Sequence, residues 1–437
     1  MAQIAPFAGI HYAPARVPIA AVIAPPYDVI SPAQQDALYA RHPQNIVRLI
    51  LNKEEPGDDA RHNRYTRAAA FLRDGLAHGA LVQDDAPALY EYVQQFEHPL
   101  EPERLLVRRA LFVALRLEPY ENGVVLPHEE THPKAKADRL ELMRATRANP
   151  EPIFGLYEDP AQTVANRLEA ARGASDPMLM AIFPGQRTPD AEQHLLYRHT
   201  DSRLLADIAA FFAPRRVWIA DGHHRYETAL NYQREQGDGG GQKPSDYLLI
   251  GLSAFEDPGL VILPTHRLVK NLPAARLEQL ALQLDRYFHV QTMPTTAARA
   301  WIKRQTSEEK RFALLLPQGK AYALTLRDLG LADAALDNAH CAAWRHLDVT
   351  ILQALVLDRT LGISWAALAH TPDVAYTRDE EEAVQKVQSG EYQLACLLQN
   401  PTVTEVRDVA AAGDKMPQKS TFFYPKLWSG LILRSLE

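Results

Sequence analysis

The stretch "VWIADGHHRYETAL", residues 217–230, constrains this chain more than any other. An apolar run that is typical of a buried strand ends at Ala220, and a helix-forming segment follows His224 without a connecting loop. Between them lie an acidic residue, a glycine, two histidines and an arginine. We therefore predict that a strand passes directly into a helix here and that these polar residues occupy the turn.

The residues of this turn have the chemistry of an anion site. The first turn of a helix presents free backbone N–H groups and the positive end of the helix dipole. Gly222 lets a ligand approach the backbone, and Arg225 offers a planar fork that matches phosphate or carboxylate. His223 and His224 can donate hydrogen bonds or move a proton near neutral pH. Asp221 ends a strand, where α/β proteins often contact ligands. The alternative is that Asp221 caps the helix and the imidazoles are surface polar groups.

Strand-like and helix-like segments alternate along the whole chain. We predict strands at 45–52, 88–96, 109–117, 215–220, 247–255, 259–264, 311–317, 320–326 and 392–398. We predict helices at 59–78, 134–147, 201–213, 223–236, 273–285, 295–306, 334–357 and 378–388, a helix start at Ser31-Pro32, and a flexible loop at 237–246. The fold class is therefore mixed α/β (α+β). A restart of the pattern near residue 270 predicts an N-terminal α/β domain, 1–270, and a C-terminal α/β domain, 271–437.

Composition excludes several classes of function. The net charge of −7 argues against a dedicated nucleic-acid binder. No apolar run approaches the roughly 20 residues of a membrane span, and the N-terminus lacks the features of a signal peptide. Two cysteines, Cys341 and Cys396, give neither a disulfide framework nor a cysteine zinc cluster. We therefore expect a cytoplasmic protein with no membrane contact and no nucleic-acid partner.

The segment "HEETH", residues 128–132, matches the zinc-protease pattern H-E-x-x-H. That chemistry needs both histidines on one helical face with the glutamate beside them. Pro127 precedes the segment, and Pro133 follows it and biases His132 away from the helical region. We therefore expect no zinc here.

The charged residues around "HEETH" leave two other interpretations open. One is a solvated charged loop that leads into the next helix. The other is a loop that closes over a phosphorylated ligand, in which Lys134 neutralises the ligand and Glu129 activates an acceptor group.

Asp28 ends the extended run "APPYDVIS" just before a helix. Its hard oxygen atoms suit a general base or a magnesium ligand. Equally, the carboxylate can satisfy backbone groups within the turn. The chain has neither a Walker-type glycine loop nor a Rossmann glycine fingerprint, so a bound nucleotide is held in another way.

Two later segments also carry groups that suit phosphate. His266 and Arg267 follow the strand predicted at 259–264, where they either reach the same ligand or form a partly exposed polar turn. Near the C-terminus, Lys419, Ser420 and Thr421 precede three aromatic residues. Lysine beside hydroxyl groups suits phosphate, whereas the alternative is a core strand with solvated lysines around it.

Seven stretches resemble a widespread prokaryotic family, domain-of-unknown-function family 1015. They are "APPYDVIS", "NIVRLIL", "HEETHPKAKADRLEL", "PIFGLY", "ADGHHRYETA", "PTHRLV" and "MPQKSTFFYPKL". The Asp-Gly-His-x-Arg turn at 221–225 is also similar to the phosphate-binding turn of the ParB/sulfiredoxin-like fold. That fold includes nucleotide-hydrolysing switches, sulfiredoxin and kinases of free serine. The resemblance implies a ParB/sulfiredoxin-like core with large insertions, roughly residues 60–200, within the N-terminal domain.

These observations lead to three hypotheses on function. The first is a nucleotide-dependent phosphotransferase or phosphohydrolase that acts on a small polar metabolite such as free serine, with Mg²⁺ and ATP or ADP as cofactors. Its catalytic candidates are Asp28, Glu129, His223 and His224. The second is a non-catalytic regulatory protein that binds a nucleotide or another small phosphorylated ligand. The third is a metal-dependent hydrolase using His223, His224 and Asp221. It is disfavoured because neighbouring residues of a helix point about 100° apart, so two adjacent histidines rarely bind one metal.

The first prediction concerns zinc at residues 128–132. Because proline flanks the segment on both sides, protein purified without added zinc should contain no stoichiometric zinc by elemental analysis. Stoichiometric zinc that disappears in the double variant His128→Ala, His132→Ala would contradict this expectation.

Overall fold

The computed structural model describes residues 1–129, 133–185, 191–237, 242–304, 309–336, 339–368 and 371–437. The structure is mixed α/β, as the sequence predicts. It divides into two compact units. The first unit contains Met1–Pro127, Thr131–Leu260 and Pro425–Glu437, and the second contains His128–Glu130 and Val261–Tyr424. The predicted boundary near residue 270 and the predicted insertion at roughly 60–200 remain predictions.

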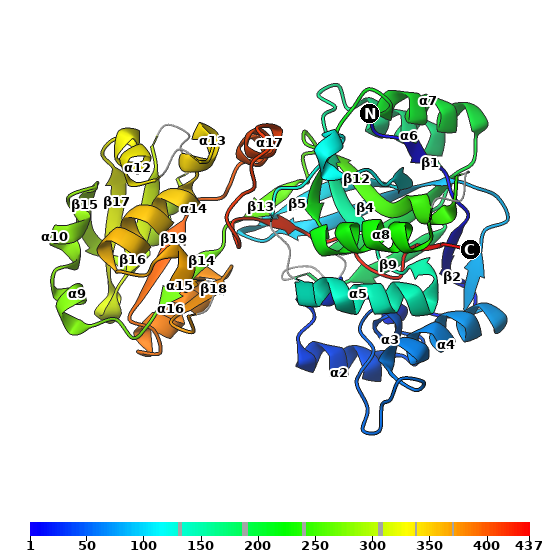
Figure 1. Ribbon diagram of the computed structural model, residues 1–437, viewed down its shortest axis with the longest axis horizontal. Helices are drawn as coiled ribbons and strands as arrows, with labels where there is room; N and C mark the ends of the chain where they lie inside the picture. The colour runs from blue at the N-terminus through cyan, green and yellow to red at the C-terminus, as the bar shows by residue number, and fades with distance from the viewer. Residues whose placement is uncertain (130–132, 186–190, 238–241, 305–308, 337–338, 369–370) are drawn as a thin grey trace. The chain divides into compact units, whose positions relative to one another are not determined.

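A large sheet forms the centre of the first unit (Figure 1). Its strands, in spatial order, are β6 (Val125–Leu126), β11 (Val217–Asp221), β8 (Ile153–Tyr157), β12 (Tyr247–Ala254), β5 (Glu101–Arg116), β4 (Leu89–His98), β10 (Glu192–His199) and β9 (Leu179–Phe183), and β1 (Ile4–Ala5) pairs with β5. The pairs β11–β6 and β12–β8 are parallel, and the other pairs are antiparallel. The strand that leads to the predicted turn, β11, therefore lies between two neighbours.

A second, smaller sheet of the first unit joins segments from both ends of the chain. Its order is β3 (Leu81–Gln83), β2 (Gly9–Tyr12), β21 (Leu433–Ser435) and β7 (Ala148–Asn149). The helical segments of this unit are α1 (Ile19–Val22), η1 (Tyr27–Val29), α2 (Pro32–Arg41), α3 (Val47–Ile50), α4 (Arg64–Ala77), η2 (Tyr120–Asn122), α5 (Pro133–Thr146), α6 (Thr163–Arg172), α7 (Ser202–Phe212), α8 (His223–Glu235) and η3 (Pro244–Asp246).

The core of the first unit explains where its helices lie. Buried side chains of α6, α7 and α8 pack together with those of β5, β11 and β12 in one apolar cluster. These helices therefore cover one face of the large sheet, because burying an apolar stripe against a sheet stabilises both elements. Helices α5 and α8 run side by side (Figure 1), which places α5 next to the predicted turn.

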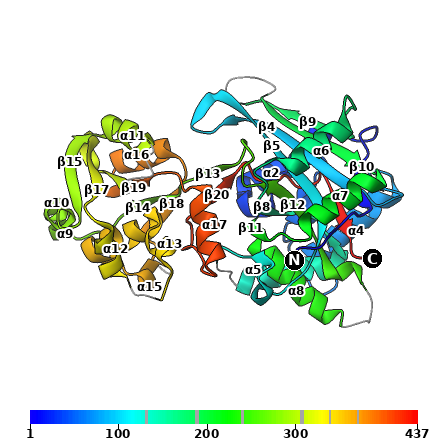
Figure 2. The same ribbon diagram turned by 90° about the horizontal axis from the view of Figure 1, so that it is seen from above.

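The second unit is built on a separate antiparallel sheet. Its order is β15 (Phe288–Pro294), β17 (Lys320–Leu326), β16 (Arg311–Leu315), β19 (Leu394–Leu398), β14 (His266–Val269) and β18 (Val374–Thr377), while β13 (Val261–Leu263) pairs with β20 (Phe422–Tyr424). Its helical segments are α9 (Ala274–Glu278), α10 (Leu280–Leu284), α11 (Thr295–Lys303), η4 (Pro317–Gly319), α12 (Leu329–Ala335), α13 (Ala342–Arg345), α14 (Asp348–Ile351), η5 (Leu352–Thr360), α15 (Trp365–Leu368), α16 (Glu380–Gln388) and α17 (Val403–Ala411). Helices α11 and α16 cover one face of this sheet (Figure 2).

Most of the predicted elements are confirmed. Ser31 caps α2, since its hydroxyl accepts a hydrogen bond from the Gln34 backbone nitrogen at 3.3 Å. Asp201 caps α7 in the same way, at 2.8 Å from the Leu204 nitrogen. The predicted hairpin of 311–317 and 320–326 is formed by β16 and β17. Residues 238–241 of the predicted loop lie outside the described residues. Within the described part of the chain, no helix is long and apolar enough to cross a membrane.

The prediction of a strand at 45–52 is wrong, because Val47–Ile50 form the short helix α3. The apolar run is buried on every side, and such a run carries no period that separates a strand from a buried helix. The side chain of Asn45 fixes the helical start. Its oxygen accepts a hydrogen bond from the Val47 nitrogen at 3.0 Å, and its nitrogen donates to the Ala21 carbonyl at 2.8 Å.

Two predicted helices are broken into shorter ones. The helix expected at 273–285 forms as α9 and α10, separated by Gln279. The helix expected at 334–357 is split among α12, α13, α14 and η5, and residues 337–338 lie outside the described residues. Leu347 adopts an extended conformation, with φ −66° and ψ 139°, which ends one helical turn before the next begins.

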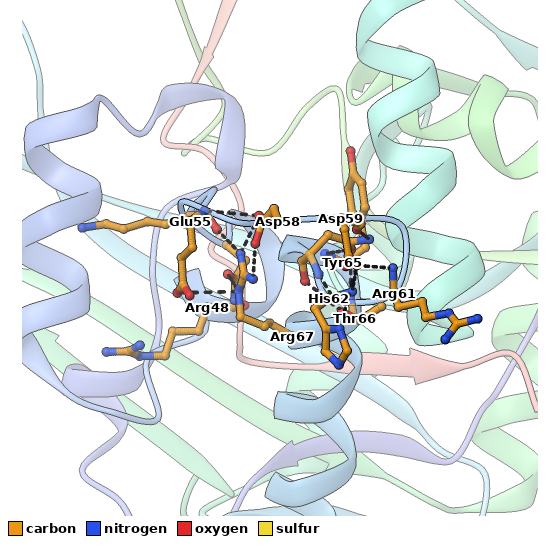
Figure 3. A network of polar contacts seen from close by, with 12 residues as sticks. Arg48, Glu55, Asp58, Asp59, Arg61, His62, Tyr65, Thr66 and Arg67 are labelled. Atoms are coloured by element: carbon orange, nitrogen blue, oxygen red, sulfur yellow. Dashed lines mark hydrogen bonds and ion pairs between the residues drawn. The ribbon is translucent and has the colours of Figure 1, made fainter.

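A polar network fixes the loop that precedes α4 (Figure 3). The guanidinium of Arg67 donates to both oxygens of Asp58, at 2.6 and 2.9 Å. Asp59 accepts hydrogen bonds from the backbone nitrogens of Arg61 and His62, at 2.7 Å each. The helix therefore begins at Arg64 and not at residue 59 as predicted. The network thus fixes the start of α4.

Candidate functional site

The structure confirms that a strand passes directly into a helix at the predicted turn. β11 ends at Asp221, and α8 begins at His223. Gly222 lies between them with φ +95°, a conformation that residues other than glycine rarely adopt. A Cβ atom at this position would lie 2.7 Å from the Ile153 Cγ2 atom. Backbone conformation and packing therefore both require glycine.

Asp221 forms ion pairs with two cations. Its Oδ2 atom accepts a hydrogen bond from Arg225 Nη2 at 2.8 Å, and its Oδ1 atom contacts the ammonium of Lys426. Burial raises the pKa of Asp221, but Lys426 and Arg225 lower it more, to about 2. Asp221 is therefore a carboxylate at neutral pH that holds the two cations in place.

Arg225 is buried, and acceptors within the first unit bind both of its terminal nitrogens. Nη1 donates to the Pro152 carbonyl at 2.6 Å, and Nη2 donates to Asp221. Burial lowers the pKa of Arg225, but the negative charges of Glu151 and Asp221 raise it more. The fork that the sequence suggests for phosphate thus binds the protein itself in this structure. Its role toward a ligand remains a prediction.

Glu151 is the most enclosed acid of the cluster, with a side chain only 2% exposed. Its Oε1 atom accepts hydrogen bonds from the Tyr27 backbone nitrogen and from the Ser429 hydroxyl, both at 3.0 Å. Its Oε2 atom lies 3.6 Å from Arg139 Nη1. Burial raises the pKa of Glu151, although Arg225 and Arg139 oppose this effect. Glu151 therefore joins the N-terminal segment, the C-terminal segment and α5 at one point.

Arg139 links this cluster to the outer helices. Its Nη1 atom donates to the Ile50 carbonyl at 2.8 Å, and its Nη2 atom donates to Asp138 at 2.6 Å. Asp138 in turn accepts hydrogen bonds from Arg64 at 2.6 Å and from the Tyr65 hydroxyl at 2.8 Å. The start of α4 is thus connected to the cluster through Asp138 and Arg139 of α5.

Asp28 differs from the other acids because its side chain is exposed to solvent. The surrounding protein raises the pKa of Asp28, first by desolvation and then by repulsion from Asp221, while Arg225 and Lys426 oppose the rise. Because the residue as a whole is exposed, solvent screens part of this effect. Asp28 and Asp221 therefore have pKa values displaced in opposite directions, a pattern that suits acid–base chemistry.

The two histidines of the turn differ in exposure. His223 is 4% exposed and lies near Asp221. The positive charge of a protonated His223 ring lowers the pKa of Asp221. His224 is only partly buried. Their predicted roles as proton carriers or phosphate ligands remain predictions.

His266 and Arg267 belong to the second unit, where both lie buried in β14. The Nδ1 atom of His266 lies 3.3 Å from the Leu398 backbone nitrogen, which donates to it. Burial lowers the pKa of His266 to about 3, so the ring is neutral. Arg267 donates to the carbonyls of Thr265 and Lys419.

Three other predicted residues of the second unit, Lys419, Ser420 and Thr421, directly precede β20. Lys419 is exposed and has φ +58°. The hydroxyl of Ser420 donates to the Pro417 carbonyl, and the hydroxyl of Thr421 lies 3.1 Å from His128 Nε2. Glu129 also belongs to this unit. Lys134 lies in α5 of the first unit, and its side chain, like residues 130–132, is outside the described part of the structure.

Sequence reasoning did not assign four residues to this cluster: Tyr27, Arg139, Glu151 and Lys426. No local pattern connects them with the turn at 221–225, because their partners are distant in the chain. The only signal is the position of Glu151 between two prolines at the start of an apolar strand. Among the described residues, no group of three or more His, Cys, Asp or Glu side chains could hold a metal ion by itself.

Comparison with known proteins gives one family match. A family model described as "Protein of unknown function (DUF1015)" matches residues 4–350. No curated protein matches the chain.

Several solved structures are similar to the chain at low identity. A conserved hypothetical protein from Pyrococcus furiosus matches at 14% identity over 73% of this chain and 92% of that chain, with a TM-score of 0.33. A free serine kinase in complex with AMP matches at 13% identity over 72% and 86%, with a TM-score of 0.33. SbnI from Staphylococcus aureus, with a C-terminal truncation, matches at 11% identity over 73% and 85%, with a TM-score of 0.35. At these TM-scores, no residue or activity is transferred to this chain.

The second prediction tests the turn itself. Gly123 also has a positive φ, +63°, but a Cβ atom there meets no atom within 4 Å in the described structure. Gly123→Ala should therefore cost only the backbone strain, about 1 kcal/mol. Gly222→Ala should cost roughly 1–3 kcal/mol more, because its methyl group would overlap Ile153. Urea unfolding of both variants measures the difference, and equal losses would show that no steric constraint acts at Gly222.

The third prediction tests the two carboxylates. Asp221 has a pKa near 2 in the folded protein, below its ordinary value of 3.8, so Asp221→Asn should lower stability at pH 7 by roughly 2 kcal/mol. The difference in unfolding free energy between wild type and Asp221→Asn should have its full value above about pH 4 and should vanish as the pH falls through about 2. The raised pKa of Asp28 means that folding disfavours its charged form. Asp28→Asn should therefore increase stability at pH 7, and this gain should disappear below about pH 4.

Urea unfolding between pH 3 and pH 8 measures both effects. A loss of stability at pH 7 in Asp28→Asn would mean that its carboxylate satisfies backbone groups, the alternative that the sequence left open.

Proposed function

Since the chain belongs to the family described as "Protein of unknown function (DUF1015)", whose description names no reaction, we propose a function from the residues of this chain. It is a nucleotide-dependent phosphotransferase or phosphohydrolase that acts on a small polar metabolite. The observation that carries the proposal is the pair Asp28 and Asp221, with pKa values displaced in opposite directions, beside Arg225 and Lys426 at the start of α8.

The cations of the turn would attract phosphate. Lys426 and Arg225 contribute positive charge, and the first turn of α8 contributes backbone N–H groups and the helix dipole. Asp221 positions both cations. Phosphoryl transfer depends mainly on such positioning and charge neutralisation.

Asp28 is the group that would move a proton. In the transferase reaction, an acceptor hydroxyl oxygen bonds to the terminal phosphorus of ATP while the bond from that phosphorus to the bridging oxygen breaks. ADP leaves, and the hydroxyl proton passes to the carboxylate of Asp28. In the hydrolase reaction, water replaces the acceptor. A raised pKa makes Asp28 a better proton acceptor than Asp221.

A divalent cation fits this arrangement. Mg²⁺ keeps several water ligands and binds through one or two carboxylates together with substrate phosphates, so it needs no larger cage of protein groups. Mg²⁺ bound mainly through the nucleotide phosphates and water would neutralise phosphate charge and would leave the carboxylate of Asp28 to accept the proton. A contact of Lys134 with the ligand remains part of this proposal. The candidates that lie in the second unit are not part of it; they are Glu129, His266, Arg267, Lys419, Ser420 and Thr421. Because of the resemblance to kinases of free serine, serine is the first acceptor to test.

The second candidate function is a regulatory protein that binds phosphate without turnover. The internal pairing of Arg225 and Lys426 with Asp221 favours it, because an anion that enters must compete with Asp221 for both cations. Turnover separates the two candidates.

The fourth prediction tests the proposed function. Calorimetric titration of the full chain with ATP, ADP and CTP, each with Mg²⁺, should detect binding of at least one nucleotide. Lys426→Met should weaken that binding roughly ten- to hundred-fold, because a charged hydrogen bond to an ion contributes about 1.5–3 kcal/mol. The control Lys320→Met removes an exposed lysine and should bind as the wild type does. Asp28→Asn should bind the nucleotide but lose phosphate release or transfer to serine.

Arg225→Lys separates a ligand contact from a structural role. Lysine keeps the charge but loses the fork. A lowered melting temperature with unchanged nucleotide affinity would reject a phosphate contact by Arg225. If the wild type binds none of the three nucleotides, the nucleotide part of the proposal fails.

A further inference from the structure

The second unit contains a cavity of about 520 Å³ that none of the proposed chemistry uses. Trp344, Trp365 and Tyr376 line it with aromatic surface, and Arg267 and Lys415 add positive charge. This volume lies in the range of cavities that bind small molecules, roughly 300–1,000 Å³. Aromatic walls with a few convergent polar groups are also typical of such sites.

Arg267 is a buried cation without a counter-ion. It is 4% exposed, and its guanidinium donates to two neutral carbonyls, those of Thr265 and Lys419. Among the described residues, no carboxylate forms an ion pair with it. Burial lowers the pKa of Arg267 to about 10, which still leaves it charged at neutral pH. A buried charge of this kind is costly unless an ion of opposite sign joins it.

The acid in the cavity wall does not compensate Arg267. Asp414 lies 2.9 Å from His340 Nδ1 and accepts hydrogen bonds from the backbone nitrogens of Cys341 and Lys415, each at 2.9 Å. Its oxygens are therefore already bound by other groups. The cavity thus retains a positive side at Arg267.

The aromatic wall also carries an unsatisfied donor. Trp344 stacks on His340 with 3.8 Å between ring centroids and an interplanar angle of 13°, and it lies 5.6 Å from the ring of Trp365. The indole nitrogen of Trp344 is buried and has no hydrogen-bond partner among the described residues. Buried indole N–H groups usually find an acceptor, so the wall contains a polar hydrogen that the described residues leave unpaired.

We propose that this cavity binds a small anion that carries a flat aromatic ring. The acidic group lies on Arg267, and the ring lies against the walls formed by Trp344, Trp365 and Tyr376. The proposal does not depend on phosphoryl transfer at the α8 turn, because all of these residues belong to the second unit.

Four probes separate the features of such a ligand. AMP and indole-3-acetate combine an aromatic ring with phosphate and carboxylate respectively, adenosine lacks the charge, and inorganic phosphate lacks the ring. In calorimetric titrations of the full chain, at least one of the two anionic aromatic probes should bind at least tenfold more tightly than both adenosine and phosphate. The better of the two identifies the acidic group. Failure of both to bind, or equal binding of adenosine, would overturn the proposal.

Variants then locate the site. Arg267→Met should weaken the better probe at least tenfold, whereas Arg359→Met, which removes an exposed arginine of the same unit, should leave its affinity unchanged. Tyr376 is 37% exposed, so Tyr376→Ala should fold even if Arg267→Met does not, and it should weaken the probe severalfold without changing the melting temperature. Unchanged affinity in folded Arg267→Met and Tyr376→Ala would overturn the proposal. If Lys426→Met loses binding while Arg267→Met and Tyr376→Ala keep it, the probe binds to the first unit, and the proposal is overturned.

Discussion

The buried carboxylate of Glu151 is the interaction on which the first unit depends. A charge at this depth is tolerated only when partners surround it. Those partners come from distant parts of the chain: the backbone of Tyr27, the hydroxyl of Ser429 and the guanidinium of Arg139. The segment Pro425–Glu437 returns to the first unit after the whole second unit. That return supplies Ser429 to Glu151 and Lys426 to Asp221, so the C-terminal segment is part of the candidate site.

Around Glu151, three acids and three cations form one electrostatic cluster: Asp28, Glu151 and Asp221 with Arg139, Arg225 and Lys426. Its geometry determines which of the acids has the lowest pKa. Asp221 contacts Lys426 and Arg225 directly, so its pKa falls despite burial. Glu151 and Asp28 have weaker compensation, so their pKa values rise. Of the three acids, Asp28 is the most exposed residue. The cluster therefore places its most basic accessible carboxylate beside its positive charge, an arrangement that costs stability and suits proton transfer.

The sequence was sufficient where the determining contacts are local. The turn at 221–225 was predictable because a strand, a glycine and a helix follow one another in the sequence. The N-cap at Ser31 was predictable because its hydrogen-bond partner lies three residues away. The strand predicted at 45–52 failed because burial on all sides removes the periodic signal. Only the part of the candidate site that is formed by residues close in the sequence was predictable. Asp221 pairs with a lysine 205 residues later, and Arg225 with a carbonyl 73 residues earlier. No spacing rule connects such residues before the fold is known.

The two units treat a buried arginine in opposite ways, and the difference has consequences for ligands. Arg225 lies among carboxylates, so its charge is compensated within the protein. An anion gains little there unless it displaces Asp221 from one of its cations. Arg267 lies among carbonyl groups and beside a cavity, so its charge is not compensated by any described acid. An anion that reaches Arg267 replaces no existing ion pair. The second unit therefore offers the larger gain for anion binding, while the first offers, in Asp28, the group that is suited to chemistry.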